Sequence, residues 1–326
     1  MSVNLDNPKT YHQYDLSESY DVLPKFSRHF EKGISDAQSI FLNYTPTEYT
    51  DFNILTTGQD KHLAEIIHSF SPFFLNINLH ISTGFRLPNH TTHNSLILVL
   101  ASTANQSEIK SVTSEIESKK YRAVFLTHPS YQQESQSELN YQSHAHTIGF
   151  IFGLLARFNP QFSKTIAFDK IFTLTESTGH KLTKDVDQKN NPAKSLSQKH
   201  SQKAVLLFSS GHLSGVASYI SGLIIKQSKT FSTSWSFPEV KHFSESLLTY
   251  PVKALSEYQV LLLNSELFPN NIKSEIADFK QLLAKKRINY TEIKPDSTDW
   301  FEQIAESVVF LSYFSYYLSI TNKVKI

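Results

Sequence analysis

The sequence alternates short apolar runs with amphipathic helical segments, and it does so twice in the same order. In the first half, strand-like runs occupy 53–57, 74–82, 96–101 and 122–127, and helical patterns occupy 20–38, 61–70, 107–119 and 146–158. In the second half, strand-like runs occupy 204–208, 231–235, 260–264 and 289–293, and helical patterns occupy 213–225, 272–287 and the end of the chain from Asp299. Strands that alternate with helices form parallel sheets covered on both faces. We therefore expect an α/β fold of two lobes, each a three-layer αβα sandwich: residues 1–165 with a leading helix, and residues 166–326 with a terminal helix.

Composition excludes several classes of function. The chain has 31 basic and 30 acidic residues, so no overall field would attract nucleic acid or an anionic membrane. It has no cysteine, which excludes disulfides and thiolate metal sites, and only nine glycines, which disfavours Gly-rich nucleotide loops. The apolar stretch 308–320 is too short to span a bilayer and contains serines, so we expect a buried helix there. The N-terminus carries no signal-peptide pattern, and we expect a cytoplasmic location.

Six segments, in sequence order, resemble the bifunctional phosphoglucose/phosphomannose isomerases, which carry two sugar isomerase (SIS) domains. They are FRLPNHTTHNSL (85–96), ASTANQSEI (101–109), NPAK (191–194), SSGHLSGVASYISGLIIKQSK (209–229), FPEVKH (237–242) and SYFSYYLSI (312–320). The resemblance covers nearly the whole chain. It implies two SIS-type lobes, a homodimer, no cofactor, and a sugar phosphate or related carbohydrate as partner.

The resemblance also locates the phosphate cradle of that family, which uses hydroxyls and backbone amides at helix N-termini. The corresponding ligand-binding positions are Gly58, Gln59 and Asp60 in the first turn, and Ala101, Thr103, Asn105 and Gln106 in the second. Among the family's hydroxyl positions in the second turn, only Thr103 keeps a hydroxyl. A carboxylate at Asp60 would satisfy the amides internally and repel a phosphate dianion, and it also suits the N-cap of a helix that begins near Lys61. A register error of a few residues would bring Thr56, Thr57 or Ser102 into the cradle instead.

The proton-transfer base of the family is a glutamate, and its position is occupied here by Lys226. Lysine titrates near ~10.4 and is protonated at neutral pH, so Lys226 is expected to be an ordinary surface lysine. The arginine of the family corresponds to His144 or Ala145, and its C-terminal threonine corresponds to Phe314. Loss of a general base costs ~10² to 10⁴ in rate, so turnover should be lost.

His242 matches the histidine that opens the sugar ring in the family, where it reaches into the neighbouring subunit's site. It is the catalytic side chain that survives at its position, after Pro238 and Glu239. A histidine after such a turn is otherwise an ordinary loop residue.

Other chemistry finds little support in the sequence. The pairs His90 with His93 and His144 with His146 lack the spacing of a zinc site, and we expect no metal. The histidines at 144 and 146 are expected to face solvent at a helix start. Residues 209–211 do not form a nucleophile elbow, and there is no P-loop.

Three hypotheses remain. The first is a sugar-phosphate isomerase-like, carbohydrate-derivative-binding protein whose catalysis is impaired or lost. The second is an active, divergent aldose-ketose isomerase that uses His242, Glu239 or His212 in an open polar cleft. The third is a binder of an amino sugar or an unphosphorylated ligand, in which Asp60 accepts hydrogen bonds.

Overall fold

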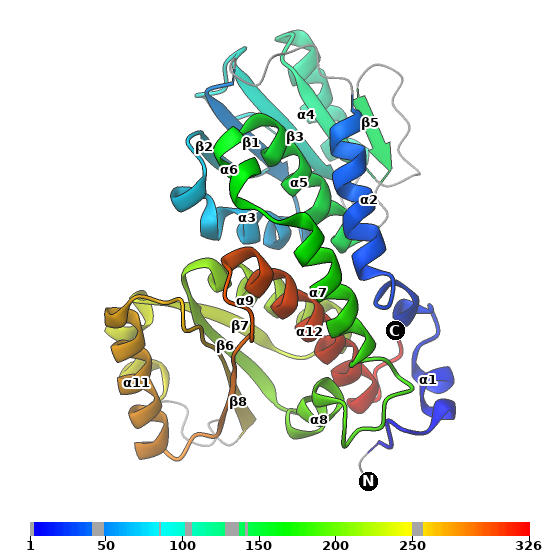
Figure 1. Ribbon diagram of the computed structural model, residues 1–326, viewed down its shortest axis with the longest axis vertical. Coiled ribbons are helices and arrows are strands. Elements are labelled where there is room, and N and C mark those ends of the chain that lie inside the picture. Colours follow the sequence, from blue (N-terminus) through cyan, green and yellow to red (C-terminus); the bar gives the residue numbers. More distant parts are fainter. Residues whose placement is uncertain are drawn as a thin grey trace. The chain divides into compact units, whose positions relative to one another are not determined.

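The computed structural model describes residues 3–40, 49–84, 86–101, 106–127, 137–140, 143–249 and 257–326. The chain divides into two compact units, shown in Figure 1: residues 27–172 form the first, and residues 1–26 with 173–326 form the second. This division differs from the predicted lobes 1–165 and 166–326 because the leading segment packs with the C-terminal half. The predicted boundary between the lobes at residues 165 and 166 remains a prediction.

The first unit contains a five-stranded parallel sheet. Its strands are β1 (Asp51–Thr56), β2 (Asn78–Thr83), β3 (Ser95–Ala101), β4 (Ala123–Thr127) and β5 (Ser137–Asn140), in the order β2-β1-β3-β4-β5. Every residue of β1, β3 and β4 is buried, as expected for strands covered on both faces. The predicted strand 74–82 begins later, because α3 continues to Phe74.

The helices of the first unit include two that approach closely. The elements are α2 (Phe26–Ser39), α3 (Asp60–Phe74), α4 (Gln106–Ser118), α5 (His144–Phe158) and α6 (Pro160–Thr165), and α7 (Phe168–His180) spans the boundary between the units. Figure 1 shows α2 beside α5. A Cβ atom at Gly33 of α2 would lie 2.1 Å from the carbonyl oxygen of His146, and one at Gly149 of α5 would lie 2.1 Å from that of Phe30. The two helices therefore pack through their glycines.

The second unit contains a four-stranded parallel sheet that repeats the first four positions of the other sheet. Its strands are β6 (Ala204–Ser210), β7 (Ser232–Phe237), β8 (Tyr258–Leu263) and β9 (Tyr290–Ile293), in the order β7-β6-β8-β9. Both sheets thus place the second strand beside the first, and the third and fourth on its other side. The predicted α/β fold of two parallel-sheet lobes is confirmed.

The helices of the second unit surround this sheet. They are α1 (Pro8–Tyr14), α8 (Pro192–Lys199), α9 (Ser214–Ser228), α10 (Ser244–Leu247), α11 (Asn270–Lys285) and α12 (Trp300–Thr321), with 3₁₀ turns η1 (Ser19–Val22), η3 (Gly211–Leu213) and η4 (Glu239–His242). Helix α12 is buried over most of its length, which confirms the prediction for 308–320. Within the described ranges, no helix is long and apolar enough to cross a membrane.

A tyrosine cluster explains why the leading segment joins the second unit. The ring of Tyr11 stacks on Tyr316 at a centroid distance of 6.3 Å, and the ring of Tyr20 lies 5.4 Å from it. Backbone hydrogen bonds also join Leu16 to the C-terminal Ile326 at 2.7 Å. The leading segment precedes the first unit in sequence, yet it packs with the second, because large aromatic side chains contribute much of the stability of a core.

Candidate functional site

The turn between β1 and α3 holds the first group of predicted ligand-binding residues. Gly58 has φ 56°, in the left-handed region that favours glycine, and the backbone N–H of Asp60 donates to the carbonyl oxygen of Thr57 at 3.3 Å. This tight turn starts α3 at the carboxyl end of β1. Open parallel sheets bind ligands at that edge, where helix N-termini present unpaired N–H groups.

Three buried polar atoms at this turn lack a hydrogen-bond partner among the described residues. They are the hydroxyl oxygen of Thr56 and both the amide nitrogen and the amide oxygen of Gln59. Thr56 is 2% exposed and Gln59 is 9% exposed. Buried polar groups are almost always hydrogen-bonded. Among the described residues, this turn leaves without a partner a hydroxyl that can donate and accept, an amide nitrogen that donates and an amide oxygen that accepts. The sequence suggested Thr56 only through a shifted register, and it gave no sign that the amide of Gln59 is unsatisfied.

Asp60 follows Gln59 in the same turn. The prediction that Asp60 is the N-cap of the helix is wrong. Helix α3 begins at Asp60 itself, and Gln59 stands at the N-cap position without a side-chain capping bond. Asp60 is 1% exposed. A carboxylate in the first helical turn is favourable beside the positive end of the helix dipole, and it opposes an incoming dianion.

The end of β3, which precedes the second predicted turn in the sequence, lies beside the end of β1. Thr56 pairs with Leu100 across the two parallel strands, so Ala101 lies one residue further toward the same edge. Ala101 is buried and Gln106 is the first residue of α4. Thr103 and Asn105 lie outside the described residues. The structure thus brings Gly58, Gln59 and Asp60 to the edge where β3 ends.

Lys226 and His242 belong to the second unit, and the structure does not bring them together. Lys226 is exposed in the last turn of α9, near the start of β7, whereas His242 is exposed in η4, just after the end of β7. Helix α9 has 15 residues and is therefore about 22 Å long. The two side chains thus lie at opposite ends of one parallel sheet.

The carboxyl edge of the second sheet holds a buried polar network that sequence reasoning missed. The Nε2 atom of His212 lies 2.8 Å from Oε1 of Gln303, and the Ser265 hydroxyl donates to the same oxygen at 2.6 Å. The amide nitrogen of Gln303 donates to the carbonyl oxygen of Ser297 at 2.7 Å. Burial lowers the pKa of His212 to about 4, and its ring stacks on Trp300 at 4.6 Å. His212 is thus a neutral, packed side chain at pH 7, which makes it a poor candidate for an accessible acid or base.

His146, one of the histidines of the predicted pairs, has a structural role in the first unit. His146 was expected to face solvent; it is instead fully buried, and its Nε2 atom lies 3.0 Å from Oδ2 of Asp36. Burial favours a higher pKa for Asp36, but hydrogen bonds from His146 and Lys32 outweigh that effect and lower it. Burial lowers the pKa of His146 against the opposing effect of Asp36. The described residues contain no cluster of three or more metal-ligating side chains of the His, Cys, Asp and Glu types.

Residues 189–325 match the family described as the bacterial phospho-glucose isomerase C-terminal SIS domain. The fold is similar to a glucose-6-phosphate isomerase-like protein from Thermus thermophilus, with TM-score 0.64, 14% identity and coverage of 99% of this chain and 97% of that one. It is also similar to glucosamine-6-phosphate deaminase from Thermotoga maritima, with TM-score 0.66, 14% identity and 95% coverage of each chain. No curated protein matches the sequence. At 14% identity, these two structures support the fold alone. The family match relates residues 189–325 to the SIS domain of bacterial phospho-glucose isomerases.

Proposed function

We propose that this chain, a divergent SIS protein whose residues 189–325 belong to the bacterial phosphoglucose isomerase C-terminal SIS family, binds a carbohydrate derivative without isomerising it. The ligand site of the proposal is the turn between β1 and α3, together with the end of β3. The reaction that the chain has lost is aldose-ketose isomerisation.

The observation that carries the proposal is the set of unpartnered atoms at this turn. A buried hydroxyl and a buried amide that lack partners cost stability, because each forfeits its hydrogen bonds to water. Sugar hydroxyls donate and accept hydrogen bonds, so they match the Thr56 hydroxyl and both ends of the Gln59 amide. A bound sugar would therefore satisfy the three atoms that the described residues leave unpaired.

Asp60 decides which part of the ligand lies at this turn. Its buried carboxylate, at the first helical residue, disfavours a phosphate dianion and favours hydroxyl or ammonium donors. We place the hydroxyl end of a sugar or an amino sugar here. A sugar phosphate would bind with its phosphoryl group directed away from Asp60.

The loss of catalysis rests on Lys226. Isomerisation needs a base that moves a proton between C1 and C2, and the family's glutamate is replaced by a lysine. Lys226 is exposed at the end of α9. His242 and Glu239 are also exposed, and no second acid or base is paired with either of them in the part of the chain that the structure describes. These observations disfavour the alternative of an active isomerase built around His242.

The experiment is a calorimetric titration of glucose 6-phosphate, fructose 6-phosphate, glucose and glucosamine into the purified chain, beside a coupled isomerase assay. We expect binding of at least one of these ligands, no turnover above the uncatalysed rate, and at least tenfold weaker binding in Gln59→Ala. Gln161→Ala, an exposed position on α6, is the matched control and should bind as the wild type does. Turnover by the wild-type chain would refute the loss of catalysis, and equal affinity in Gln59→Ala would refute the site.

A further inference from the structure

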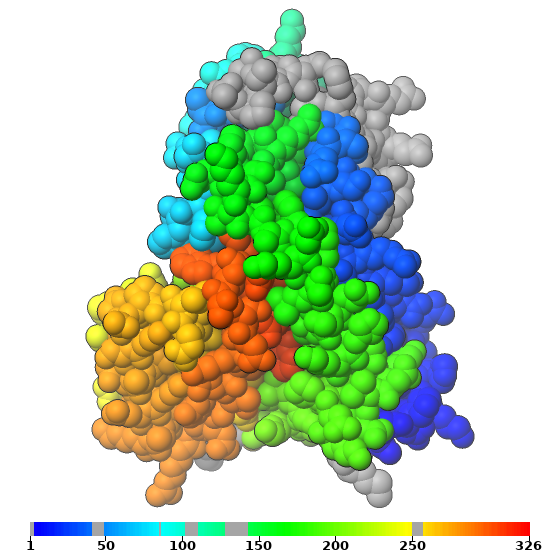
Figure 2. Space-filling model, in the orientation of Figure 1, coloured from blue at the N-terminus to red at the C-terminus, as the bar shows by residue number. Residues whose placement is uncertain are grey.

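The second unit contains a pocket whose lining includes none of the predicted site residues. Its volume is about 670 Å³, and its walls come from the end of α7, from α8, from β9 with the segment that follows it, and from α12. Figure 2 shows this face hollowed between the green surface of α7 and α8 and the orange surface of the segment after β9. Strand β9 forms one edge of the sheet, whereas β7, which leads to His242, forms the other. A volume of this size suits a small organic ligand.

One part of the wall is apolar. Leu182 and Leu196 are buried at 1% and 5% exposure, and Ile293, Pro295 and Phe310 are half-buried around the same space. These side chains come from four separate segments of the chain. They would cover the apolar body of a ligand.

Two acidic side chains in the wall are already engaged with the protein. Glu292 accepts hydrogen bonds from the side chains of Asn264 at 2.6 Å and Lys280 at 2.7 Å. Glu306 accepts hydrogen bonds from the backbone N–H of Asp296 at 3.2 Å and from the Ser297 hydroxyl at 2.9 Å. Glu292 is therefore paired with a lysine, whereas the donors to Glu306 are a backbone N–H and a hydroxyl, which are neutral.

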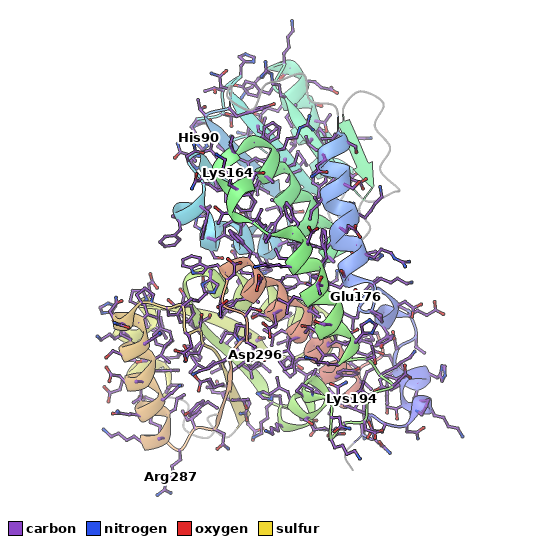
Figure 3. All side chains as sticks on the ribbon, viewed as in Figure 1. His90, Lys164, Glu176, Lys194, Arg287 and Asp296 are labelled. Atoms are coloured by element: carbon purple, nitrogen blue, oxygen red, sulfur yellow. The ribbon has the colours of Figure 1, made fainter. Side chains whose placement is uncertain are left out.

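Two lysines in the wall are not engaged in this way. Lys181 follows the end of α7 and Lys199 ends α8, and both are exposed. In the described part of the chain neither forms an ion pair, whereas Lys294, the third lysine of the pocket, is bound to Glu266 at 3.0 Å. Figure 3 shows Asp296 on the segment between β9 and α12, and neither Asp296 nor Glu306 forms an ion pair in the described ranges. The wall thus holds two lysines and two carboxylates without an ion pair in the described ranges, and Lys181 and Lys199 are the cations that could bind the anionic group of a ligand.

Ser307 supplies an independent sign of a ligand. It is 2% exposed, it lines the pocket from α12, and its hydroxyl has no hydrogen-bond partner among the described residues. Such a hydroxyl normally bonds to a backbone carbonyl or to water. A polar atom of a bound molecule that reached this hydroxyl would supply the missing partner.

We propose that this pocket binds a small organic anion. Its apolar body packs on Leu182, Leu196 and Phe310, its carboxylate or phosphate lies between Lys181 and Lys199, and a polar atom bonds to the hydroxyl of Ser307. The site is separate from the sugar site proposed above, and it does not depend on that proposal.

The test uses the full-length chain and the fluorescent probe 8-anilinonaphthalene-1-sulfonate, which combines an apolar body with an anionic group. The double variant Lys181→Ala/Lys199→Ala should bind the probe at least tenfold more weakly than wild type, and Ser307→Leu, which fills the pocket, should abolish the enhanced fluorescence. Lys285→Ala is the matched control, since Lys285 is an exposed helix-terminal lysine outside the pocket, and it should leave binding unchanged.

Competition then identifies the anionic group. Displacement of the probe by phenyl phosphate or by benzoate, lost in the double lysine variant, supports the proposal and shows whether phosphate or carboxylate is preferred. Circular dichroism confirms that each variant is folded. Equal probe affinity in wild type and in the folded double lysine variant would overturn the proposal, as would displacement by neither competitor.

Discussion

At the scale of single residues, the structure separates polar groups that stabilise the fold from polar groups that await a partner. The Nε2 atom of His212 is hydrogen-bonded to Gln303 in the second unit, and that of His146 to Asp36 in the first. At the turn after β1, by contrast, Thr56 and Gln59 remain unpaired among the described residues. The three arrangements predict different responses to substitution and to pH.

Substitution of Thr56 by valine should separate stability from binding. Valine has nearly the same shape and no hydroxyl, so Thr56→Val removes a buried unpaired group and should stabilise the chain by about 1 kcal/mol. The same change should weaken sugar binding, because one hydrogen bond to the ligand is lost. Urea denaturation followed by circular dichroism and calorimetry on the same preparation measure both effects. A variant that is less stable than wild type would mean that the hydroxyl already has a partner.

The buried histidines of the second unit predict a loss of stability in acid. Burial lowers the pKa of His212 and of His200 to about 4, so both are neutral in the folded state where the unfolded chain is protonated. Their contribution is fully present above the unfolded pKa of ~6.5 and falls as the pH drops toward 4. Each should cost about 2 kcal/mol between pH 7.5 and pH 5.

Tryptophan fluorescence reports this effect selectively, because the two tryptophans of the chain, Trp235 and Trp300, both belong to the second unit. Urea midpoints followed by this signal should fall from pH 7.5 to pH 5, and the fall should be smaller in His212→Gln. An equal fall in the variant would show that His212 does not contribute.

At the scale of elements, the close approach of α2 and α5 depends on two glycines. Gly33→Ala and Gly149→Ala would each place a Cβ atom 2.1 Å from a backbone carbonyl oxygen of the other helix, so the helices must separate. We expect each to cost about 1–3 kcal/mol or more. Gly179 of α7 is the control: its nearest neighbour would be the hydroxyl of Tyr313 at 3.9 Å, and Gly179→Ala should be neutral or stabilise by up to about 1 kcal/mol. Thermal unfolding followed by circular dichroism measures all three, and equal effects would contradict the packing argument.

The sequence predicts most of these elements because their patterns are local. The run before Gly58 and the apolar face of 61–70 are enough to predict strand, turn and helix, and Pro192 correctly predicts the start of α8. Strand β5 was missed because its four residues, Ser137–Asn140, lack the β-branched and aromatic side chains typical of strands. The burial of His146 was missed because its partner, Asp36, lies 110 positions away in sequence.

The candidate site was predictable only in part, for the same reason. A glycine turn at 58 and a helix after it follow from residue types, and so does the replacement of a glutamate by Lys226. Whether the amide of Gln59 finds a hydrogen-bond partner depends on the residues around it in space. It cannot be predicted from the residues beside it in the sequence. The separation of Lys226 from His242 likewise follows from the direction of α9, not from their spacing in sequence.

At the scale of the whole molecule, the positions of Lys226 and His242 bear on assembly. The resemblance to the isomerases implies a homodimer in which the histidine serves the neighbouring subunit, and the two residues at opposite ends of the second sheet are compatible with that arrangement. We predict a particle of twice the chain mass of 37.2 kDa in size-exclusion chromatography with light scattering. A monomer at all concentrations would contradict the predicted homodimer.

The restoration of the missing base is a further whole-molecule prediction. If Lys226 alone prevented turnover, Lys226→Glu would recover activity. Because Asp60 also opposes a phosphate dianion and no arginine replaces the family's arginine, we expect no recovery in the coupled isomerase assay. Activity in Lys226→Glu would show that the rest of the site is intact.

The central claim is that the chain binds a sugar derivative and does not transform it. The most direct test is saturation-transfer NMR of glucose 6-phosphate, fructose 6-phosphate and glucosamine with the protein in D₂O, which reports binding and chemistry in the same spectra. We predict saturation transfer to the protons of at least one sugar, its loss in Gln59→Ala, and no product or deuterium uptake at C1 or C2. Product formation or deuterium uptake would contradict the loss of catalysis, and the absence of saturation transfer to every sugar would contradict the binding site.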